Sequence, residues 1–219
     1  YQLGARLPDT LGKNEITIIN IPPGKRNLDP DEHLIKIQRL CSDLLQMGTK
    51  NLIFVSTTSV YGNASGTVTE LTECRPITNS GIAHLKIEQF VHKLMPQQVT
   101  VLRLAGLIGG SRHPAKSLSG KQNIPNPNQV VNLVHRDDVI TAINTIIKKE
   151  AWGHTLHLAA TDHPTRKDYY TSAAKHFRIT PPKFAEENSE FTSGKVIDAS
   201  KTLAILEMKL KYPSPIDMF

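Results

Sequence analysis

Cysteines, aromatic residues and long apolar runs are all scarce in this sequence. The two cysteines, Cys41 and Cys74, show neither the spacing of metal ligands nor a disulfide framework. No apolar run approaches the roughly 20 residues that a membrane helix needs, and there is no signal-peptide pattern. We therefore expect a cytoplasmic protein that binds no metal and has no membrane partner.

A concentrated basic surface is also lacking. The net charge is +6, but the lysines and arginines are scattered, and the densest groups are as short as Lys148–Lys149. Binding to nucleic acid favours a basic stripe or a patch interleaved with aromatic residues, so we do not expect a nucleic-acid partner. With 39% hydrophobic residues among 219, the chain has enough apolar material for one large domain, or one domain with a small appendage.

What the sequence does contain is an alternation of strand and helix patterns. Apolar and β-branched runs predict strands at 15–21, 51–56, 99–104 and 156–159, and the first suits a strand buried on both faces. Amphipathic or capped segments predict helices at 30–48, 82–94, 137–149, 165–176 and 200–208. A loop is expected over 105–129, with short extended pieces at 130–134 and 183–186. This order predicts an α/β fold with a parallel sheet and right-handed crossovers.

Several helix ends carry capping signals. Asp29 is expected to cap the first helix, with Pro30 at its first position, and Gly48 to end it. Either Asn79 or Ser80 is expected to cap the second helix, and two acidic residues, Asp137 and Asp138, are expected at the cap of the third. The first helix has one apolar face, made of Leu34, Ile37, Cys41, Leu44 and Leu45.

Ligands of open parallel sheets bind beyond the carboxyl ends of the strands, so the residues that follow each strand are the first candidates for a site. Pro22-Pro23-Gly24 is either a rigid turn that presses on a flat cofactor ring or a simple loop stop. Four hydroxyl residues, Ser56 to Ser59, follow the second strand, where they offer donors and acceptors to a ligand or form an ordinary turn. The residues alone leave both alternatives open.

Five short motifs, in this order and spacing, resemble those of the extended short-chain dehydrogenases/reductases, the NAD-dependent epimerase/dehydratase type. They are Ser56-Thr57-Thr58-Ser59-Val60-Tyr61-Gly62; Glu70 with Pro76; Val101 to Gly109; Asn132 to Val139; and Ser200-Lys201 with Leu206 and Tyr212-Pro213. The resemblance covers about 160 residues. It implies a Rossmann-like doubly wound sheet with a small C-terminal substrate-binding lobe, and oxidoreductase or isomerase chemistry.

The resemblance also implies a mechanism. In the family a Ser or Thr holds the substrate hydroxyl, and the Tyr of Tyr-x-x-x-Lys exchanges a proton while NAD(P) exchanges a hydride; the Lys holds the nicotinamide ribose and lowers the tyrosine pKa. Thr57 and Lys86 fall at the Ser/Thr and Lys positions, and we take them as the catalytic candidates. Ile82 stands where the family has Tyr, and isoleucine cannot transfer a proton. The active site is therefore expected to be atypical.

Two other residues, His84 and Tyr61, are candidates to replace the missing tyrosine. His84 lies two residues from both Ile82 and Lys86, so it points to another side of the helix and is expected to be a surface or packing histidine. Tyr61 is the second, although its family counterpart is mostly structural.

The Gly-rich turn that carries the pyrophosphate in dinucleotide folds is missing, since neither Gly-x-Gly-x-x-Gly nor Gly-x-x-Gly-x-x-Gly occurs here. Compared with the family, roughly the first three strand–helix units are absent. We expect an upstream segment to supply them, so that binding of NAD or NADP depends on it. Residues 1–110 are then the remaining part of the dinucleotide-binding domain, and 111–219 form the substrate lobe with a strand and helix returning to the sheet.

By resemblance, the cofactor contacts are assigned to Pro22, Pro23, Ser56, Thr57, Lys86, Ala105, Gly106 and Leu107, and the substrate contacts to Thr58, Arg112, His113 and Asn132. The substrate is expected to be a small molecule such as a nucleotide-sugar, and dimerisation is expected through the helices after Gly24 and Ser80. Three hypotheses stay open: an atypical NAD(P)-dependent epimerase, dehydratase or reductase; a non-catalytic relative that senses a dinucleotide; and a scaffold that binds none.

Overall fold

The computed structural model describes residues 2–8, 11, 13–24, 28–110, 113–186 and 194–219. The chain forms two compact units, each assembled from three stretches of sequence. The first unit comprises residues 1–63, 72–103 and 146–156, and the second comprises 64–71, 104–145 and 157–219. In the described part, no helix combines the length and apolar character needed to cross a bilayer.

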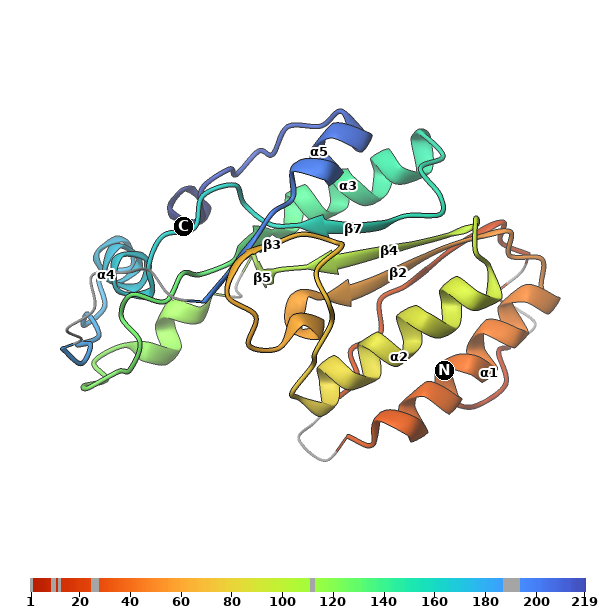
Figure 1. Cartoon of the computed structure of the whole chain (residues 1–219), viewed down its shortest axis with the longest axis horizontal. Coiled ribbons are helices and arrows are strands. Elements are labelled where there is room, and N and C mark those ends of the chain that lie inside the picture. Colours follow the sequence, from red (N-terminus) through yellow and green to blue (C-terminus); the bar gives the residue numbers. More distant parts are fainter. Residues whose placement is uncertain (1, 9–10, 12, 25–27, 111–112, 187–193) are drawn as a thin grey trace. The chain divides into compact units, whose positions relative to one another are not determined.

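A four-stranded sheet has the order β1 (Ile16–Ile19), β2 (Asn51–Thr57), β4 (Val99–Leu104) and β7 (Thr155–Leu158). β1 pairs with β2 in parallel, with Ile16 opposite Asn51 and Ile19 opposite Phe54, and the arrows of β2 and β4 point the same way in Figure 1. All four strands lie where the sequence predicts them, within a few residues at each end. The predicted parallel α/β fold is confirmed.

The two central strands and the edge strand differ in burial. Every residue of β4 is buried, as are Leu52 to Ser56 of β2. β1 instead leaves Ile16 36% and Ile18 44% exposed, and among the described residues it pairs with β2 alone. The expectation that this strand is buried on both faces is wrong, since an apolar run reports the residue types but not the position of the strand in the sheet.

Two helices of the first unit, α1 (Pro30–Gln46) and α2 (Asn79–Leu94), pack against each other (Figure 1). The Asp29 carboxylate accepts the backbone N–H groups of Asp31 and Glu32, so the predicted cap of α1 is confirmed. α2 begins three residues earlier than predicted. Its cap is Thr78, whose hydroxyl accepts from Gly81 N, and neither Asn79 nor Ser80.

The core of the first unit lies between these helices and the sheet. Ile37 and Cys41 of α1 are buried in it together with Leu40, whereas Leu34 and Leu44 are only partly covered. Leu45, which was predicted on the apolar face, is 37% exposed. At 100° per residue, Leu45 lies at the margin of the buried stripe of α1, whereas Leu40 lies within that stripe.

The second unit contains two small parallel pairs whose pairing the sequence analysis did not predict, although the extended piece expected at 130–134 overlaps one of their strands, β6. β5 (Gly106–Ile108) pairs with β6 (Leu133–His135), and β3 (Gly66–Val68) pairs with β8 (Lys195–Ile197). The predicted loop 105–129 therefore contains a strand, and also a 3₁₀ helix, η3 (Pro114–Leu118). Three-residue strands are too short to show periodicity, and each partner here lies more than 20 residues away along the chain.

The remaining helices are α3 (Arg136–Lys148), α4 (Arg166–His176), α5 (Ser200–Leu206) and the 3₁₀ helix η4 (Pro215–Met218). Thr165 caps α4 as its position predicts, accepting from Asp168 N. α5 ends two residues before the predicted position, at a left-handed Glu207. Of the piece predicted at 183–186, Phe184 forms one isolated bridge with Ile124.

Candidate functional site

The hydroxyl-rich segment begins on β2 and turns sharply after it. Thr57 is the last residue of β2 and caps a single 3₁₀ turn, η2 (Thr58–Tyr61). Its Oγ1 accepts from Ser59 N and donates to Ser59 Oγ, both at 3.1 Å. Thr57 is half-buried and Ser59 is exposed, whereas Thr58 is buried. The Thr57 hydroxyl therefore stands at the carboxyl end of a central strand, in a turn that its own side chain helps to fix.

A buried ion pair lies beside this segment. Arg103 of β4 contacts Glu88 of α2 through Nη2–Oε2 at 2.6 Å and through Nε to both carboxylate oxygens at 3.1 Å. Glu88 also accepts a hydrogen bond from Ser56 Oγ at 2.5 Å, and Arg103 Nη1 donates to Tyr61 Oη at 2.5 Å. All four side chains are less than 9% exposed. The fork geometry of the guanidinium serves two partners at once.

Tyr61 is held in a way that removes it from proton transfer. Its ring lies 5.0 Å from the Arg103 guanidinium carbon, and the residue is 1% exposed. Burial raises the pKa of the Tyr61 phenol to about 12, although the neighbouring Arg103 acts in the opposite direction. A phenol that is enclosed, already bonded and hard to ionise is a structural group.

α2 carries Ile82 and Lys86, the two residues that the sequence analysis aligns with Tyr-x-x-x-Lys. Ile82 and Lys86 lie one turn apart and both are half-buried. The Lys86 ammonium bonds the Asp31 carboxylate in the first turn of α1 at 2.5 Å. With its side chain 37% exposed, Lys86 is accessible to a ligand as well as paired with α1.

His84 lies on the buried side of α2, as predicted for a packing histidine. It is 8% exposed, its ring centroid is 5.6 Å from that of Phe54, and its Nδ1 has no hydrogen-bond partner among the described residues. Burial lowers its pKa to about 4, and the nearby His33 of α1 adds to the effect. This histidine is neutral at pH 7 and packs in the interior of the first unit.

Pro22 and Pro23, predicted to contact a cofactor, line a hollow of about 370 Å³ within the first unit. The hollow is bordered by Leu3, by Ile21 two residues after β1, and by the start of α1. The turn after β1 therefore lines an open space.

Three predicted cofactor contacts belong to the second unit. Ala105 is buried, and its N–H donates to Leu158 O. Gly106 and Leu107 form β5, where Gly106 N donates to Asn132 O. A Cβ at Gly106 would lie 2.8 Å from Leu133 Cδ2, so this glycine permits the close approach of β6.

Two predicted substrate contacts are engaged in the second unit, and Arg112 lies outside the described residues. Nδ1 of His113 accepts from Ala115 N, so its Nε2 carries the proton and donates to Tyr169 Oη at 3.1 Å. The Asn132 amide donates to Lys195 O and accepts from Ile197 N. Asn132 therefore holds β8 in place, and a role of either residue toward substrate stays a prediction.

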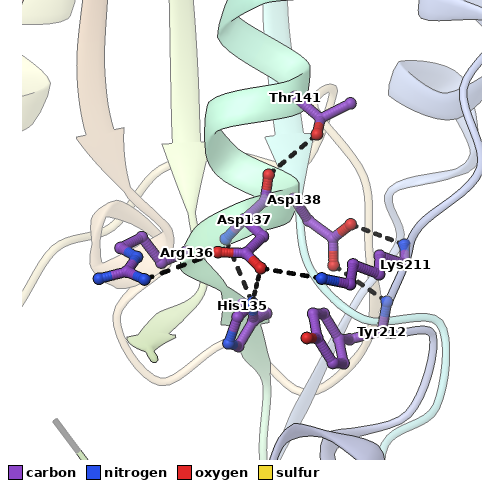
Figure 2. Close-up of polar contacts among 7 residues, drawn as sticks. All are labelled: His135, Arg136, Asp137, Asp138, Thr141, Lys211 and Tyr212. Carbon is purple, nitrogen blue, oxygen red and sulfur yellow. Dashed lines mark hydrogen bonds and ion pairs between the residues drawn. The ribbon is translucent and has the colours of Figure 1, made fainter. Parts of the chain in front are cut away.

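The start of α3 holds the C-terminal segment (Figure 2). The helix begins at Arg136, so Asp137 and Asp138 lie in its first turn and the prediction that they cap it is wrong. The buried Asp138 carboxylate accepts from the backbone N–H groups of Lys211 and Tyr212. Its partners lie over 70 residues away, so a local capping pattern could not reveal this role.

Asp137 also holds the C-terminal segment, on the more exposed side of the same turn. Its carboxylate accepts from Lys211 Nζ at 3.1 Å, and this bond lowers the pKa of Asp137. Beside it lie the rings of His135 and Tyr212 (Figure 2), whose centroids are 4.0 Å apart. The Asn132–Val139 motif thus ties the end of the chain to α3.

The sequence analysis missed Glu88 altogether and included Arg103 only as part of the Val101–Gly109 motif. One signal was available. Glu88 comes directly after Ile87 and three residues before Val91, so helical spacing places it at the border of the buried stripe of α2. Arg103 is the only charged residue of β4. Two opposite charges at such positions indicate a buried pair.

Comparisons with known proteins agree with this architecture. Residues 27–159 match the model of the NAD dependent epimerase/dehydratase family. Protein YeeZ of Escherichia coli K12 is 36% identical over 210 residues, which cover 96% of this chain and 76% of that protein. The structure of a UDP-glucose 4-epimerase from Thermotoga maritima, with UDP-glucose, superimposes with a TM-score of 0.78 at 18% identity, over 96% of this chain and 76% of that one.

A conserved protein of unknown function from Silicibacter pomeroyi gives a TM-score of 0.73 at 22% identity, over 93% of this chain and 75% of that one. Both structural likenesses concern the fold. The family match over residues 27–159 and the 36% identity to YeeZ establish the family as well. The chain belongs to the NAD-dependent epimerase/dehydratase family.

Proposed function

We propose that this protein binds NAD or NADP and acts, as an atypical epimerase, dehydratase or reductase, on a nucleotide-sugar or a similar hydroxyl or carbonyl substrate. The observation that carries the proposal is the placement of Thr57 at the carboxyl end of β2, in the same unit as Lys86 on the helix packed against that strand. Solved structures of the same fold were obtained with NAD and UDP-glucuronic acid or with NADPH, which supports this ligand class.

The described residues fit the nicotinamide and ribose half of a dinucleotide. Lys86 is a partly exposed cation that can donate to ribose hydroxyls, Thr57 supplies a hydroxyl, and Pro22 and Pro23 offer flat apolar surface beside a hollow. When bound, the cofactor supplies hydride acceptance or donation. The residues of this chain would orient the ribose and the substrate hydroxyl, and the pyrophosphate contacts are not assigned to any of them.

The proton transfer is where this protein departs from its family. Ile82 occupies the tyrosine position, Tyr61 is buried against Arg103, and His84 faces the core. These three observations favour a second candidate function, in which the protein keeps the fold and senses a dinucleotide or serves as a scaffold without catalysing the reaction.

A titration with NADH and NADPH, followed by nicotinamide fluorescence, tests the proposal. We expect saturable binding that weakens when Lys86 is replaced by Met, because the ribose loses a cationic donor. A matched control is Lys93→Met, which removes a lysine in the last turn of the same helix. Absence of saturable binding in the full-length protein would refute dinucleotide binding, and binding without turnover across a panel of nucleotide-sugars would favour the sensing role.

The replacement at position 82 can be tested by restoring the phenol. Ile82→Tyr places a hydroxyl one turn before Lys86, where a nearby cation favours the phenolate. If the missing acid/base limits turnover, the variant gains about 10²-fold or more on an accepted substrate, in line with general acid–base catalysis. Ile82→Phe is the control, since it adds the ring without the hydroxyl. Equal rates for the Tyr and Phe variants would show that this position does not limit the reaction.

A further inference from the structure

The hydroxyl-rich segment is attached at both ends to one ion pair. Ser56, at its start, donates to the Glu88 carboxylate at 2.5 Å, and Tyr61, at its end, accepts from the Arg103 guanidinium at 2.5 Å. Between these anchors lie Thr57 and Ser59, of which the first is half-buried and the second exposed. The ends of the segment are therefore buried and hydrogen-bonded, whereas the hydroxyl-bearing residues Thr57 and Ser59 between them are at least partly exposed.

We propose that Ser56, Tyr61, Glu88 and Arg103 form a clamp whose role is to position the Thr57 hydroxyl relative to Lys86. The inference rests on the proposed function for its ligand, and Glu88 and Arg103 are positioning residues in it, since they act through the segment. Glu88 is two residues after Lys86 on α2, and Arg103 comes from β4. The clamp thus links the strand end that carries the hydroxyl to the helix that carries the cation.

The energetics favour positioning over stability as the reason for the pair. Removing two charges from water costs free energy that their attraction often fails to recover, and apolar residues of the same volume frequently serve stability as well. Here the carboxylate serves Ser56 and Arg103, and Arg103 also donates to Tyr61 Oη. One pair thereby fixes several segments of backbone around a single turn.

The test uses variants that keep the ion pair, because Glu88→Gln would leave a buried guanidinium without its counter-charge. Tyr61→Phe keeps the ring over Arg103 and removes one anchor, and Ser56→Ala removes the other. The matched control is Thr100→Val, which deletes a fully buried hydroxyl on β4 that donates to Ala151 O at 2.7 Å, outside the clamp.

Two measurements are made on each variant of the full-length protein. Amide hydrogen exchange reads the turn directly, because Ser59 N donates to Thr57 Oγ1 and Gly62 N donates to Ser59 O. We expect exchange at these two amides to accelerate about tenfold or more in Tyr61→Phe and in Ser56→Ala, the factor that corresponds to the loss of one hydrogen bond to a charged group. The dissociation constant for NADH or NADPH is expected to rise by a similar factor in Tyr61→Phe.

The control separates positioning from general weakening, because Thr100→Val is expected to change neither the two amides nor the dissociation constant. The clamp is refuted if the two amides exchange at the wild-type rate in Tyr61→Phe and Ser56→Ala, or if Thr100→Val accelerates them equally. It is also refuted if the turn loosens in Tyr61→Phe while dinucleotide affinity stays at the wild-type value. If the wild-type protein binds no dinucleotide, the proposed function fails, and the exchange data then decide whether the clamp holds the turn.

Discussion

Lowering the pH from 7 to 4.5 is expected to destabilise this protein through His84. In the folded state the ring is 8% exposed, and burial lowers its pKa to about 4, whereas a histidine in an unfolded chain has a pKa near 6.5. Between these two pKa values, His84 therefore binds a proton in the unfolded state but not in the folded state. Stability from this group is complete above pH 6.5 and falls as the pH drops toward 4.

The size of the effect follows from the two pKa values. A difference of about 2.5 units corresponds to roughly 3 kcal/mol in full, and between pH 7 and 4.5 linkage gives a loss of about 2–3 kcal/mol. The group that faces His84 from α1 is His33, whose pKa is also lowered by burial, so it acts in the same direction. The Phe54 ring on β2 is not titratable and contributes packing only.

The assay is urea unfolding at a series of pH values for the wild type and for His84→Gln, which does not titrate. The wild type is expected to lose about 2–3 kcal/mol more than the variant between pH 7 and 4.5. His176→Gln, at an exposed histidine of α4, is the control and is expected to follow the wild type. Parallel pH profiles for the wild type and His84→Gln would contradict the assigned burial and pKa.

Two further substitutions test close contacts in the structure. Gly62→Ala is expected to cost several kcal/mol in urea unfolding, because Gly62 has φ of +53° and an added Cβ would lie 2.1 Å from the Arg75 carbonyl oxygen; a loss below 1 kcal/mol would refute this contact. Asp138→Ala removes a carboxylate that accepts two backbone N–H groups, so limited proteolysis is expected to cut near Lys211 and Tyr212 sooner than in Asp137→Ala, whose carboxylate is more exposed. Equal cleavage of the two variants would show that Asp138 does not hold the segment.

Local sequence determined the main elements of this protein. The β-branched runs and the capping residues Asp29 and Thr165 specify where strands and helices form, because these signals act within one or two turns. The order and spacing of short motifs also indicated the family and directed attention to Thr57, Lys86 and Ile82. Residue types alone were enough to show that position 82 cannot transfer a proton.

Only the tertiary structure decided which polar groups are free to meet a ligand and which are committed to the fold. Asn132 and Asp138 resemble candidate site or capping residues in sequence and Glu88 drew no prediction, yet the partners of all three are separated from them by 15 to 74 residues. Hydrogen bonds and ion pairs of this kind depend on how distant segments pack, so no local pattern encodes them. The exposure of β1 and the pairing of three-residue strands were decided in the same way, by the position of each segment in the folded chain.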